Sequence, residues 1–449
     1  MKEGIFNLSI QNPWWEKESL EYDPVLEEYD SQQIPFQWNV LQERELERDG
    51  VYLIQGPRGM GKTTLLKRWI RFLLEKRNLD PSRIFYYACF DLSGLEELNE
   101  ILKVYIDLQR SKNKEQRLYI FLDEVTMVKD WKEGLRYLRS SGILKNVTLI
   151  CSGSLKTSPS EDVQIKELLP LSFEQFLSLS RPGISTERNN SKSLEYYLDA
   201  YLLTGGFPSA INDFYLNNTV KQKVYDDFLY WLIADIAFTG RDMFLVRQII
   251  SNVISHAGRP VGFKTLARNT KAKTHITVQD YIGILERMFG IDILYQSSDG
   301  KEANTARSKK LYFTDPFLFW LFYCYIHNSL HYWRFARQSL HRYDVFRYLV
   351  EQVVYNHLNK LKSSPSVFFQ RDIYKKEEID FLVVTRKRAV PVMLAGGEQE
   401  IKKKKDILKR QGFPRGVIIG NGDYPPEKGI KVVTLLDFLM DTESFLFRE

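Results

Sequence analysis

A glycine-rich run between two apolar stretches constrains this chain more than any other feature. Residues 51–55 are apolar, and Gly56-Pro57-Arg58-Gly59-Met60-Gly61-Lys62-Thr63-Thr64 follows them directly. Between Thr63 and Arg77, apolar residues recur with helical spacing. This order predicts a strand, a tight loop and a helix. Glycines in such a loop let backbone N–H groups approach phosphate oxygens without a Cβ in the way.

The polar residues at the end of this run have expected roles. Lys62 is expected to reach the β- and γ-phosphates of a nucleoside triphosphate, and the Thr63 hydroxyl is expected to bind Mg²⁺. The N-terminus of the following helix adds a favourable dipole for anions. We therefore expect ATP and Mg²⁺ as ligands. The predicted phosphate-binding residues are Gly56, Pro57, Arg58, Gly59, Met60, Gly61, Lys62, Thr63 and Thr64.

A second apolar run, residues 117–122, ends in two carboxylates. We interpret it as a Walker B strand, in which Asp123 binds Mg²⁺ and Glu124 orients and deprotonates the attacking water. Carboxylates at a strand end are also common as solvated loop residues. Together with the glycine-rich loop, the pattern favours catalysis, with Glu124 and Lys62 as the catalytic residues.

Two more strands are expected around this site. Residues 83–91 form one between the two motifs, which indicates that the glycine-loop strand and the Walker B strand do not pair directly. Residues 146–151 form the other, and it ends in Ser152-Gly153-Ser154. Ser152 and Ser154 either contact the γ-phosphate or belong to an ordinary turn. Both readings stay open at this point.

Length, charge and cysteines bound the remaining possibilities. A chain of 449 residues is expected to form two to four domains. Residues 1–50 carry four Lys or Arg against twelve Asp or Glu, whereas residues 251–449 carry 32 against 21, which suggests a polyanionic partner or a solvated basic surface. Three widely spaced cysteines inside apolar runs predict reduced, buried thiols and a cytoplasmic protein: Cys89, Cys151 and Cys324.

No membrane segment or signal peptide is expected. The first ten residues lack an apolar core, and the most apolar run, Phe317–Ile326, is about half the length of a bilayer crossing. A buried helix is predicted there.

In this order the motifs resemble a prokaryotic AAA-type ATPase family with a winged helix and a C-terminal PD-(D/E)xK nuclease-like domain. The resemblance extends to Asn12-Pro13-Trp14-Trp15, Leu169–Phe176 and Leu203–Pro208. It implies an α/β fold: a P-loop parallel-sheet core of the ASCE/AAA type with a helical lid, a winged helix and a small α/β domain. The implied boundaries are 1–175 for the ATPase core, 176–240 for the lid, 241–315 for the winged helix, 316–342 for a helical connector and 343–449 for the nuclease-like domain.

The chain departs from that family at one arginine. The family usually has a Gly-Arg pair before the Pro-Leu-Ser-Phe segment, and the arginine could contact a γ-phosphate; here residues 158–163 contain none. We therefore expect slow hydrolysis, or an arginine supplied by another subunit of a homo-oligomer or by a protein partner.

The winged helix is expected from helices at 243–257, 263–269 and 277–289, followed by strands at 291–296 and 310–314. Thr277-Val278-Gln279-Asp280 is predicted to be a capping box that begins the third helix. Contact with double-stranded DNA is one use of such a domain, and protein contact or closure over the nucleotide is the other. The residues predicted to contact DNA are Lys271, Lys273, Thr274, His275, Arg307 and Lys309, with Lys301 in the same wing.

The nuclease-like part keeps only some of the groups that a nuclease needs. Glu351 and Asp380 are present, but Met393 and Ala395 stand where the resemblance implies a glutamate and a lysine. Neither can bind a metal or stabilise a phosphorane, so this domain is predicted to be inactive as a nuclease. The favoured function is an ATP-driven, DNA-associated switch or motor. The alternative is a nucleotide-gated scaffold with negligible turnover that recruits a protein partner.

Overall fold

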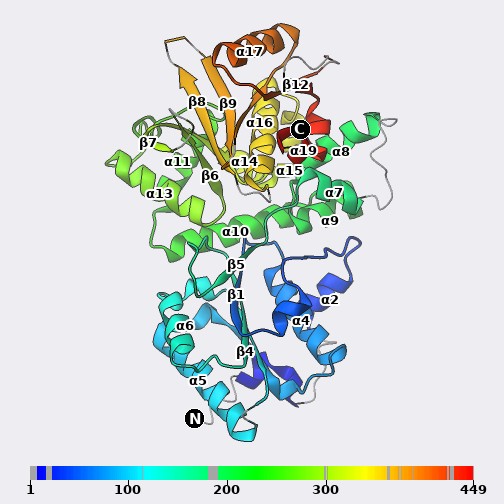
Figure 1. The fold of residues 1–449 in the computed structure, drawn as a ribbon, viewed down its shortest axis with the longest axis vertical. Coiled ribbons are helices and arrows are strands. Elements are labelled where there is room, and N and C mark those ends of the chain that lie inside the picture. The colour runs from blue at the N-terminus through cyan, green and yellow to red at the C-terminus, as the bar shows by residue number, and fades with distance from the viewer. Residues whose placement is uncertain are drawn as a thin grey trace. The chain divides into compact units, whose positions relative to one another are not determined.

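The computed structural model describes residues 8–16, 23–113, 115–180, 191–297, 300, 302–361, 365–372, 374–375, 377–386, 388–421, 424 and 429–447. The chain forms two compact units (Figure 1). The first comprises residues up to Leu169 together with Arg287–Phe289, and the second comprises Pro170–Glu286 and Gly290 onward. The five domains expected from the sequence therefore stay a prediction.

The first unit is built on a parallel sheet of five strands in the order β2-β3-β4-β1-β5. Its strands are β1 (Gly50–Gln55), β2 (Ile84–Ala88), β3 (Leu118–Asp123), β4 (Val147–Gly153) and β5 (Gln164–Glu167). The expected α/β P-loop core is confirmed. β1 and β3 are separated as expected, but the strand between them is β4, while β2 lies at the edge.

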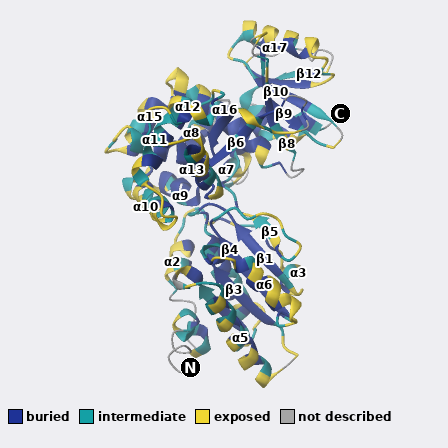
Figure 2. Ribbon diagram, turned by 90° about the vertical axis from the view of Figure 1, so that its left-hand side faces the viewer, coloured by how far each residue is buried: buried dark blue, intermediate teal, exposed yellow. Residues whose placement is uncertain are grey.

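Helices cover both faces of this sheet, so its central strands are buried and mostly apolar. Figure 1 shows α5 (Leu95–Lys112) and α6 (Trp131–Ser140) on one face and α2 (Pro24–Asp30) and α4 (Lys62–Glu75) on the other. Figure 2 shows the central strands as buried and the outer helix surfaces as exposed. The short elements of this unit are α3 (Glu43–Leu46) and the 3-10 turns η1 (Pro13–Glu16), η3 (Pro81–Arg83), η4 (Cys89–Asp91) and η5 (Val125–Met127).

The second unit contains a sheet of seven strands in the order β12-β11-β10-β9-β8-β6-β7. Its strands are β6 (Ile291–Gln296), β7 (Asn304–Phe313), β8 (Ser366–Asp372), β9 (Glu377–Val384), β10 (Ala389–Leu394), β11 (Gly416–Ile419) and β12 (Ile430–Val433). β6 and β7 form the antiparallel hairpin of the expected wing. Gln296 pairs with Phe369, so the hairpin and the strands after residue 343 share one sheet.

The helices of the second unit begin immediately after the unit boundary. They are α7 (Phe173–Ser180), α8 (Ser191–Thr204), α9 (Pro208–Asn217), α10 (Gln222–Phe238), α11 (Met243–Ser255), α12 (Phe263–Leu266), α13 (His275–Arg287), α14 (Pro316–Ile326), α15 (Tyr332–Ser339), α16 (Tyr343–Asn359), α17 (Glu398–Arg410), α18 (Leu435–Met440) and α19 (Thr442–Phe447). α14 is buried from Pro316 to Cys324, as expected for the most apolar run. Within the described residues, no helix has both the length and the apolarity that a membrane crossing demands. All three cysteines are free and buried.

One sequence prediction about α13 is wrong. The helix begins at His275 rather than at Thr277, because Thr274 caps it: the Thr274 hydroxyl accepts the backbone N–H of Thr277 at 3.2 Å. The Thr-x-x-Asp pattern at 277–280 therefore lies inside the helix. Thr274, three residues before Thr277, offers the same capping chemistry, because its hydroxyl oxygen can accept a backbone N–H.

Candidate active site

The glycine-rich loop joins β1 to α4, and its glycines are required by geometry. Gly59 and Gly61 have φ angles of 78° and 80°, in the left-handed region that other residues rarely adopt. A Cβ on Gly56 would lie 2.0 Å from the Leu168 carbonyl oxygen, and one on Gly61 would lie 2.6 Å from the Trp38 ring. No larger residue fits at either position without moving the backbone or the indole.

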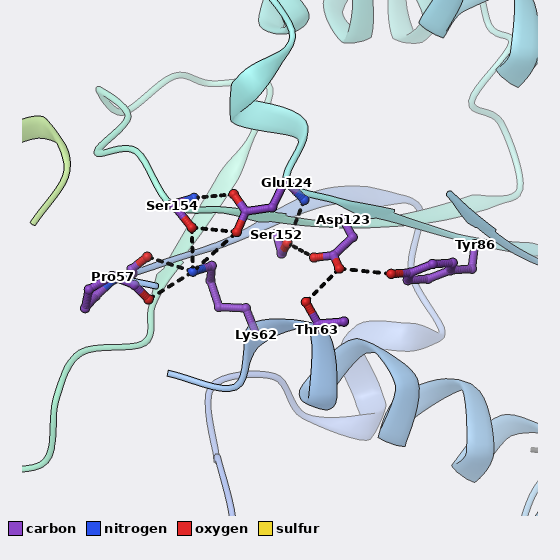
Figure 3. Close-up of polar contacts among 9 residues, drawn as sticks. Pro57, Lys62, Thr63, Tyr86, Asp123, Glu124, Ser152 and Ser154 are labelled. Atoms are coloured by element: carbon purple, nitrogen blue, oxygen red, sulfur yellow. Dashed lines mark hydrogen bonds and ion pairs between the residues drawn. The ribbon is translucent and has the colours of Figure 1, made fainter. Parts of the chain in front are cut away.

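Lys62 folds back into this loop (Figure 3). Its ammonium donates to the carbonyl oxygens of Gly56 and Pro57 at 2.9 and 3.0 Å and to the Ser154 hydroxyl at 2.9 Å. The Glu124 carboxylate lies 3.6 Å away. Burial lowers the pKa of Lys62, and the neighbouring Glu124 and Asp123 oppose that shift. The cation is thus held by groups that an incoming phosphate would replace.

Asp123 ends β3 and is 1% exposed. Its Oδ2 accepts hydrogen bonds from the Thr63 hydroxyl at 2.7 Å and the Tyr86 hydroxyl at 2.9 Å, and its Oδ1 accepts one from Ser152. A carboxylate and a hydroxyl side by side are hard oxygen ligands of the kind that Mg²⁺ prefers. Thr63 and Asp123 therefore fit the expected metal-binding role.

Glu124 follows in a left-handed conformation, with φ 55° and ψ 39°. Such a backbone is uncommon for a residue other than glycine and is frequent at functional sites. Its side chain is buried and accepts the Ser154 hydroxyl at 2.5 Å and the Ser154 N–H at 2.9 Å. Its own N–H donates to the Ser152 hydroxyl at 2.9 Å. The turn at the end of β4 therefore positions the glutamate.

A family profile described as an AAA domain matches residues 48–177, which include the loop, Asp123, Glu124 and both serines. Residues 48–177 form an AAA-type P-loop ATPase domain. A second profile, described as a domain of unknown function (DUF8612), matches residues 195–322.

Three curated relatives match part of the chain at low identity. An uncharacterized protein of Methanocaldococcus jannaschii is 25% identical over 64% of this chain and 67% of its own length. A Haemophilus influenzae protein is 24% identical over 54% and 61%, and a second Methanocaldococcus jannaschii protein is 27% identical over 40% and 41%. The aligned regions thus span about two thirds or less of these relatives.

Among solved structures, Thermotoga maritima RuvB matches with a TM-score of 0.27 and 19% identity over 54% of this chain and 81% of that one. The Aeropyrum pernix ORC1 protein, solved in complex with DNA, matches with a TM-score of 0.29 and 13% identity over 59% and 83%. At these TM-scores the likeness says nothing about function.

The AAA domain brings together six of the residues singled out from the sequence, namely Lys62, Thr63, Asp123, Glu124, Ser152 and Ser154. Of the other loop residues, Met60 is fully buried and the Arg58 guanidinium lies 5.8 Å from the centroid of the Phe90 ring. Pro57 contributes a carbonyl oxygen, and Thr64 lies in the first turn of α4. Ser152 donates to Asp123 and Ser154 donates to Glu124, while the two alternatives for residues 152–154, a γ-phosphate contact and an ordinary turn, both stay predictions.

Sequence reasoning missed Tyr86. This tyrosine lies on β2, which pairs with β3 so that Ala88 stands opposite Asp123. Tyr86 itself stands opposite Phe121, two residues before Asp123, and its hydroxyl extends toward the Asp123 carboxylate. The only sequence signal was an aromatic residue in a predicted strand, which most often indicates packing alone.

No arginine replaces the absent one in residues 158–163. Asp162 there accepts a hydrogen bond from Arg136 Nε at 2.8 Å, so this segment carries a carboxylate where the family resemblance implies a cation. The Arg136 guanidinium is therefore paired with Asp162 at the surface and does not take the place of the missing γ-phosphate contact.

The residues predicted to contact DNA divide into two groups. Lys271, Lys273, Thr274, His275 and Arg307 are exposed. Lys309 is 2% exposed, with its ammonium 4.0 Å from the centroid of the Phe263 ring and a hydrogen bond to the Thr305 carbonyl at 3.1 Å. Its charge therefore points into the unit and is not presented to a phosphate backbone. Lys301 lies outside the described residues.

The carboxylates of the nuclease-like part are neutralised by two lysines. Lys310 lies 2.7 Å from Glu351 and 2.8 Å from Glu378, and Lys404 of α17 lies 2.7 Å from Asp380. Burial raises the pKa of Asp380, but Lys404 and Lys310 outweigh it and hold that pKa below its usual value. Among the described residues, no group of three or more metal-ligating side chains has the arrangement of a metal site.

Proposed function

We propose that this protein is a Mg²⁺-dependent ATPase in which Lys62, Thr63, Asp123 and Glu124 bind and hydrolyse ATP. The observation that carries the proposal is the convergence of these four side chains at the ends of β1 and β3, next to a glycine loop that opens a helix. The loop amides and the α4 dipole bind the triphosphate, and Lys62 neutralises its terminal charge. Mg²⁺, held by Thr63 and Asp123, supplies further charge neutralisation.

Glu124 is the proposed general base. Its carboxylate is buried, lies directly after the Asp123 position and is oriented by Ser154. A carboxylate in that place orients a water and accepts its proton. Ser154 bonds to Glu124 and to the Lys62 ammonium, which occupies the loop. Nucleotide binding therefore has to displace the Lys62–Ser154 contact before hydrolysis.

Steady-state phosphate release tests the proposal. Glu124→Gln should lower the rate by about 10²-fold or more, because general-base catalysis contributes that much, while ATP binding persists. Glu161→Gln, at an exposed position of the same unit, is the matched control. Equal rates for Glu124→Gln and wild type would exclude the glutamate as the base.

The missing arginine bears on the rate. Without an arginine in addition to Lys62 to stabilise the developing γ-phosphate charge, turnover should be slow in isolated chains and should rise if a second copy or a protein partner supplies one. A specific activity that increases with protein concentration would support that arrangement.

We further propose that the chain is DNA-associated, with α13 and the β6–β7 hairpin as the contact surface. The supporting observations are the exposed Lys271, Lys273 and Arg307 and the basic charge of the C-terminal half. Replacing Lys271 and Lys273 by alanine should reduce the slope of log affinity against log salt by about 2, since each phosphate contact releases counterions. Lys402→Ala, at an exposed lysine of α17, is the control.

The second candidate function is a nucleotide-gated scaffold with negligible turnover. It is favoured by the closed Lys62–Ser154–Glu124 arrangement and by the carboxylate at Asp162. Salt-dependent DNA binding with a clear slope would count against this scaffold, whereas tight ATP binding with no phosphate release would favour it over the motor. In both cases the lysine-neutralised cluster around Glu351 and Asp380 supports a C-terminal part that does not cleave DNA.

A further inference from the structure

Tyr86 donates its hydroxyl to Oδ2 of Asp123 at 2.9 Å, next to the Thr63 hydroxyl on the same oxygen (Figure 3). We infer that Tyr86 is a positioning residue for this carboxylate and that the segment Gln11–Trp15 holds Tyr86 in place. The inference rests on the proposed function, because it assigns Asp123 to Mg²⁺. It extends that function by connecting the metal site to the start of the chain.

Asp123 needs this donor because of its burial. A buried carboxylate is stable only when its oxygens accept hydrogen bonds. Asp123 has three side-chain donors, from Ser152, Thr63 and Tyr86. If Thr63 were to turn its hydroxyl oxygen to a bound Mg²⁺, Tyr86 would be the remaining side-chain donor to Oδ2. The tyrosine would then fix the direction in which Asp123 presents its other lone pairs.

The bond between Tyr86 and Asp123 is shielded from solvent. Tyr86 is 7% exposed and Asp123 is 1% exposed, so water does not compete for the bond.

Tyr86 lies on an edge strand, and edge strands leave backbone groups unpaired. At the free edge of β2, the Asn12 side chain makes the hydrogen bonds that a neighbouring strand would make. Its Oδ1 accepts the Tyr86 N–H at 2.7 Å, and its Nδ2 donates to the Tyr86 carbonyl at 2.9 Å. The amide thus pairs with both backbone groups of the one residue whose hydroxyl contacts Asp123. Asn12 is fully buried, which excludes water from both bonds.

The neighbours of Asn12 extend this clamp. Gln11 accepts the Ala88 N–H at 2.8 Å, and the indole N–H groups of Trp14 and Trp15 donate to the Ile84 carbonyl at 3.1 and 2.9 Å. Trp15 also stacks near Phe85, with ring centroids 6.0 Å apart. Side chains of the segment Gln11–Trp15 therefore bond to the backbone of every second residue of β2, namely Ile84, Tyr86 and Ala88. These bonds hold β2 in position along the edge of the sheet.

A purely structural clamp would stabilise the fold and leave metal affinity unchanged, so the decisive measurement is the Mg²⁺ dependence. Tyr86→Phe keeps the ring and removes only the donor. We expect the Mg²⁺ concentration for half-maximal ATP hydrolysis to rise about three- to tenfold, the loss of one hydrogen bond to a charged group. Nucleotide affinity in EDTA should stay within about twofold, because Tyr86 makes no contact with the glycine loop among the interactions of the described residues.

Tyr87→Phe is the matched control, since Tyr87 is the next residue of β2 and its ring stacks near Phe85 on the opposite face. Asn12→Ala should raise the Mg²⁺ requirement in the same direction, and combining it with Tyr86→Phe should add little, as expected for residues that act in series. Thermal unfolding measured in parallel separates this effect from loss of folded protein.

The outcomes separate the inference from the function on which it rests. An unchanged Mg²⁺ midpoint in Tyr86→Phe would overturn the role of Tyr86, and an Asn12→Ala variant that changes only the melting temperature would overturn the clamp. If wild-type protein shows no Mg²⁺-dependent hydrolysis or ATP binding, the proposed function fails and this inference fails with it.

Discussion

Ser154 donates its hydroxyl to Oε1 of Glu124 at 2.5 Å and its backbone N–H to Oε2 at 2.9 Å. The same hydroxyl oxygen accepts the Lys62 ammonium at 2.9 Å. One serine thus connects the proposed base to the proposed phosphate-binding cation. Because Glu124 has a left-handed backbone, these bonds also hold a strained residue in place.

Ser154→Ala should lower the rate of ATP hydrolysis about tenfold, because the glutamate loses one charge-assisted hydrogen bond that sets its orientation. ATP affinity should change by less than about threefold, since the loop and Lys62 remain. Phosphate release and equilibrium ATP binding measure the two effects. Ser158→Ala, at an exposed serine beyond the same strand, should change neither; a Ser154→Ala variant with wild-type turnover would contradict the assignment.

Gly206→Ala should destabilise the second unit. An added Cβ would lie 2.3 Å from the Leu171 nitrogen and 2.4 Å from its oxygen, and these backbone atoms cannot move aside because Leu171 N–H donates to the Gly206 carbonyl at 3.0 Å. We expect a loss of at least about 2 kcal/mol, seen as a melting temperature lower by roughly 5 °C. Gly262→Ala has no atom within 4 Å of the new Cβ and should melt like wild type.

His357 should make stability depend on pH. Its Nε2 accepts the Phe173 N–H at 3.0 Å, and its Nδ1 lies 2.8 Å from the Val353 carbonyl, which fixes the neutral tautomer. Burial, with a smaller contribution from the charge of Lys360, lowers the pKa of His357 from 6.5 to about 3. The unfolded chain therefore binds more protons between these values, and stability is lost as pH falls from about 6.5 toward 3.

His357→Gln removes the titrating group. The variant should be less stable than wild type at pH 7, and this difference should shrink on acidification by up to about 5 kcal/mol, the equivalent of the pKa shift. Chemical denaturation at several pH values measures it. Asp315 of the same unit, whose pKa burial raises to about 6, contributes with the opposite sign and is unchanged in both proteins. A constant difference across pH would contradict the shift.

Lys310→Met should strongly destabilise the second unit. The lysine is 1% exposed and neutralises Glu351 and Glu378, while the Tyr312 hydroxyl donates to the same Glu351 oxygen at 2.7 Å. Removing one partner of a buried ion pair costs about 3–5 kcal/mol because the other charge stays buried. Lys402→Met, at an exposed position, should stay within about 0.5 kcal/mol in denaturant titration.

Local chemistry made the glycine-rich loop predictable. Gly59, Gly61 and Lys62 lie within four positions of one another, and this spacing predicts a strand, a loop and a helix. The structure has β1, the loop and α4 at these positions. Asp123 was also predictable, because an apolar strand has to end where charged residues begin. The two serines at the end of β4 could be recognised as polar, but the sequence left their role open between a turn and a phosphate contact.

Other features depend on which distant segments meet. Lys309 was predicted to lie in a basic wing, yet it and its neighbour Lys310 are both buried, because β7 faces Phe263 on one side and Glu351 on the other. The sequence around a lysine in a strand does not indicate which distant side chain the lysine will contact. The start of α13 was misplaced for a related reason, since two threonines offered a cap and only Thr274 meets the helix N-terminus.

The sequence by itself determined that a glycine-rich loop, an acidic strand end and an apolar helix at Phe317–Ile326 exist, because each depends on neighbouring residues and short-range sterics. The tertiary structure alone decided that the Tyr86 hydroxyl donates to Asp123, that Asn12 pairs with an edge strand 74 residues away, and that buried lysines pair with the C-terminal carboxylates. These relationships depend on sheet order and strand register. Both are fixed by the packing of the whole unit rather than by any local pattern.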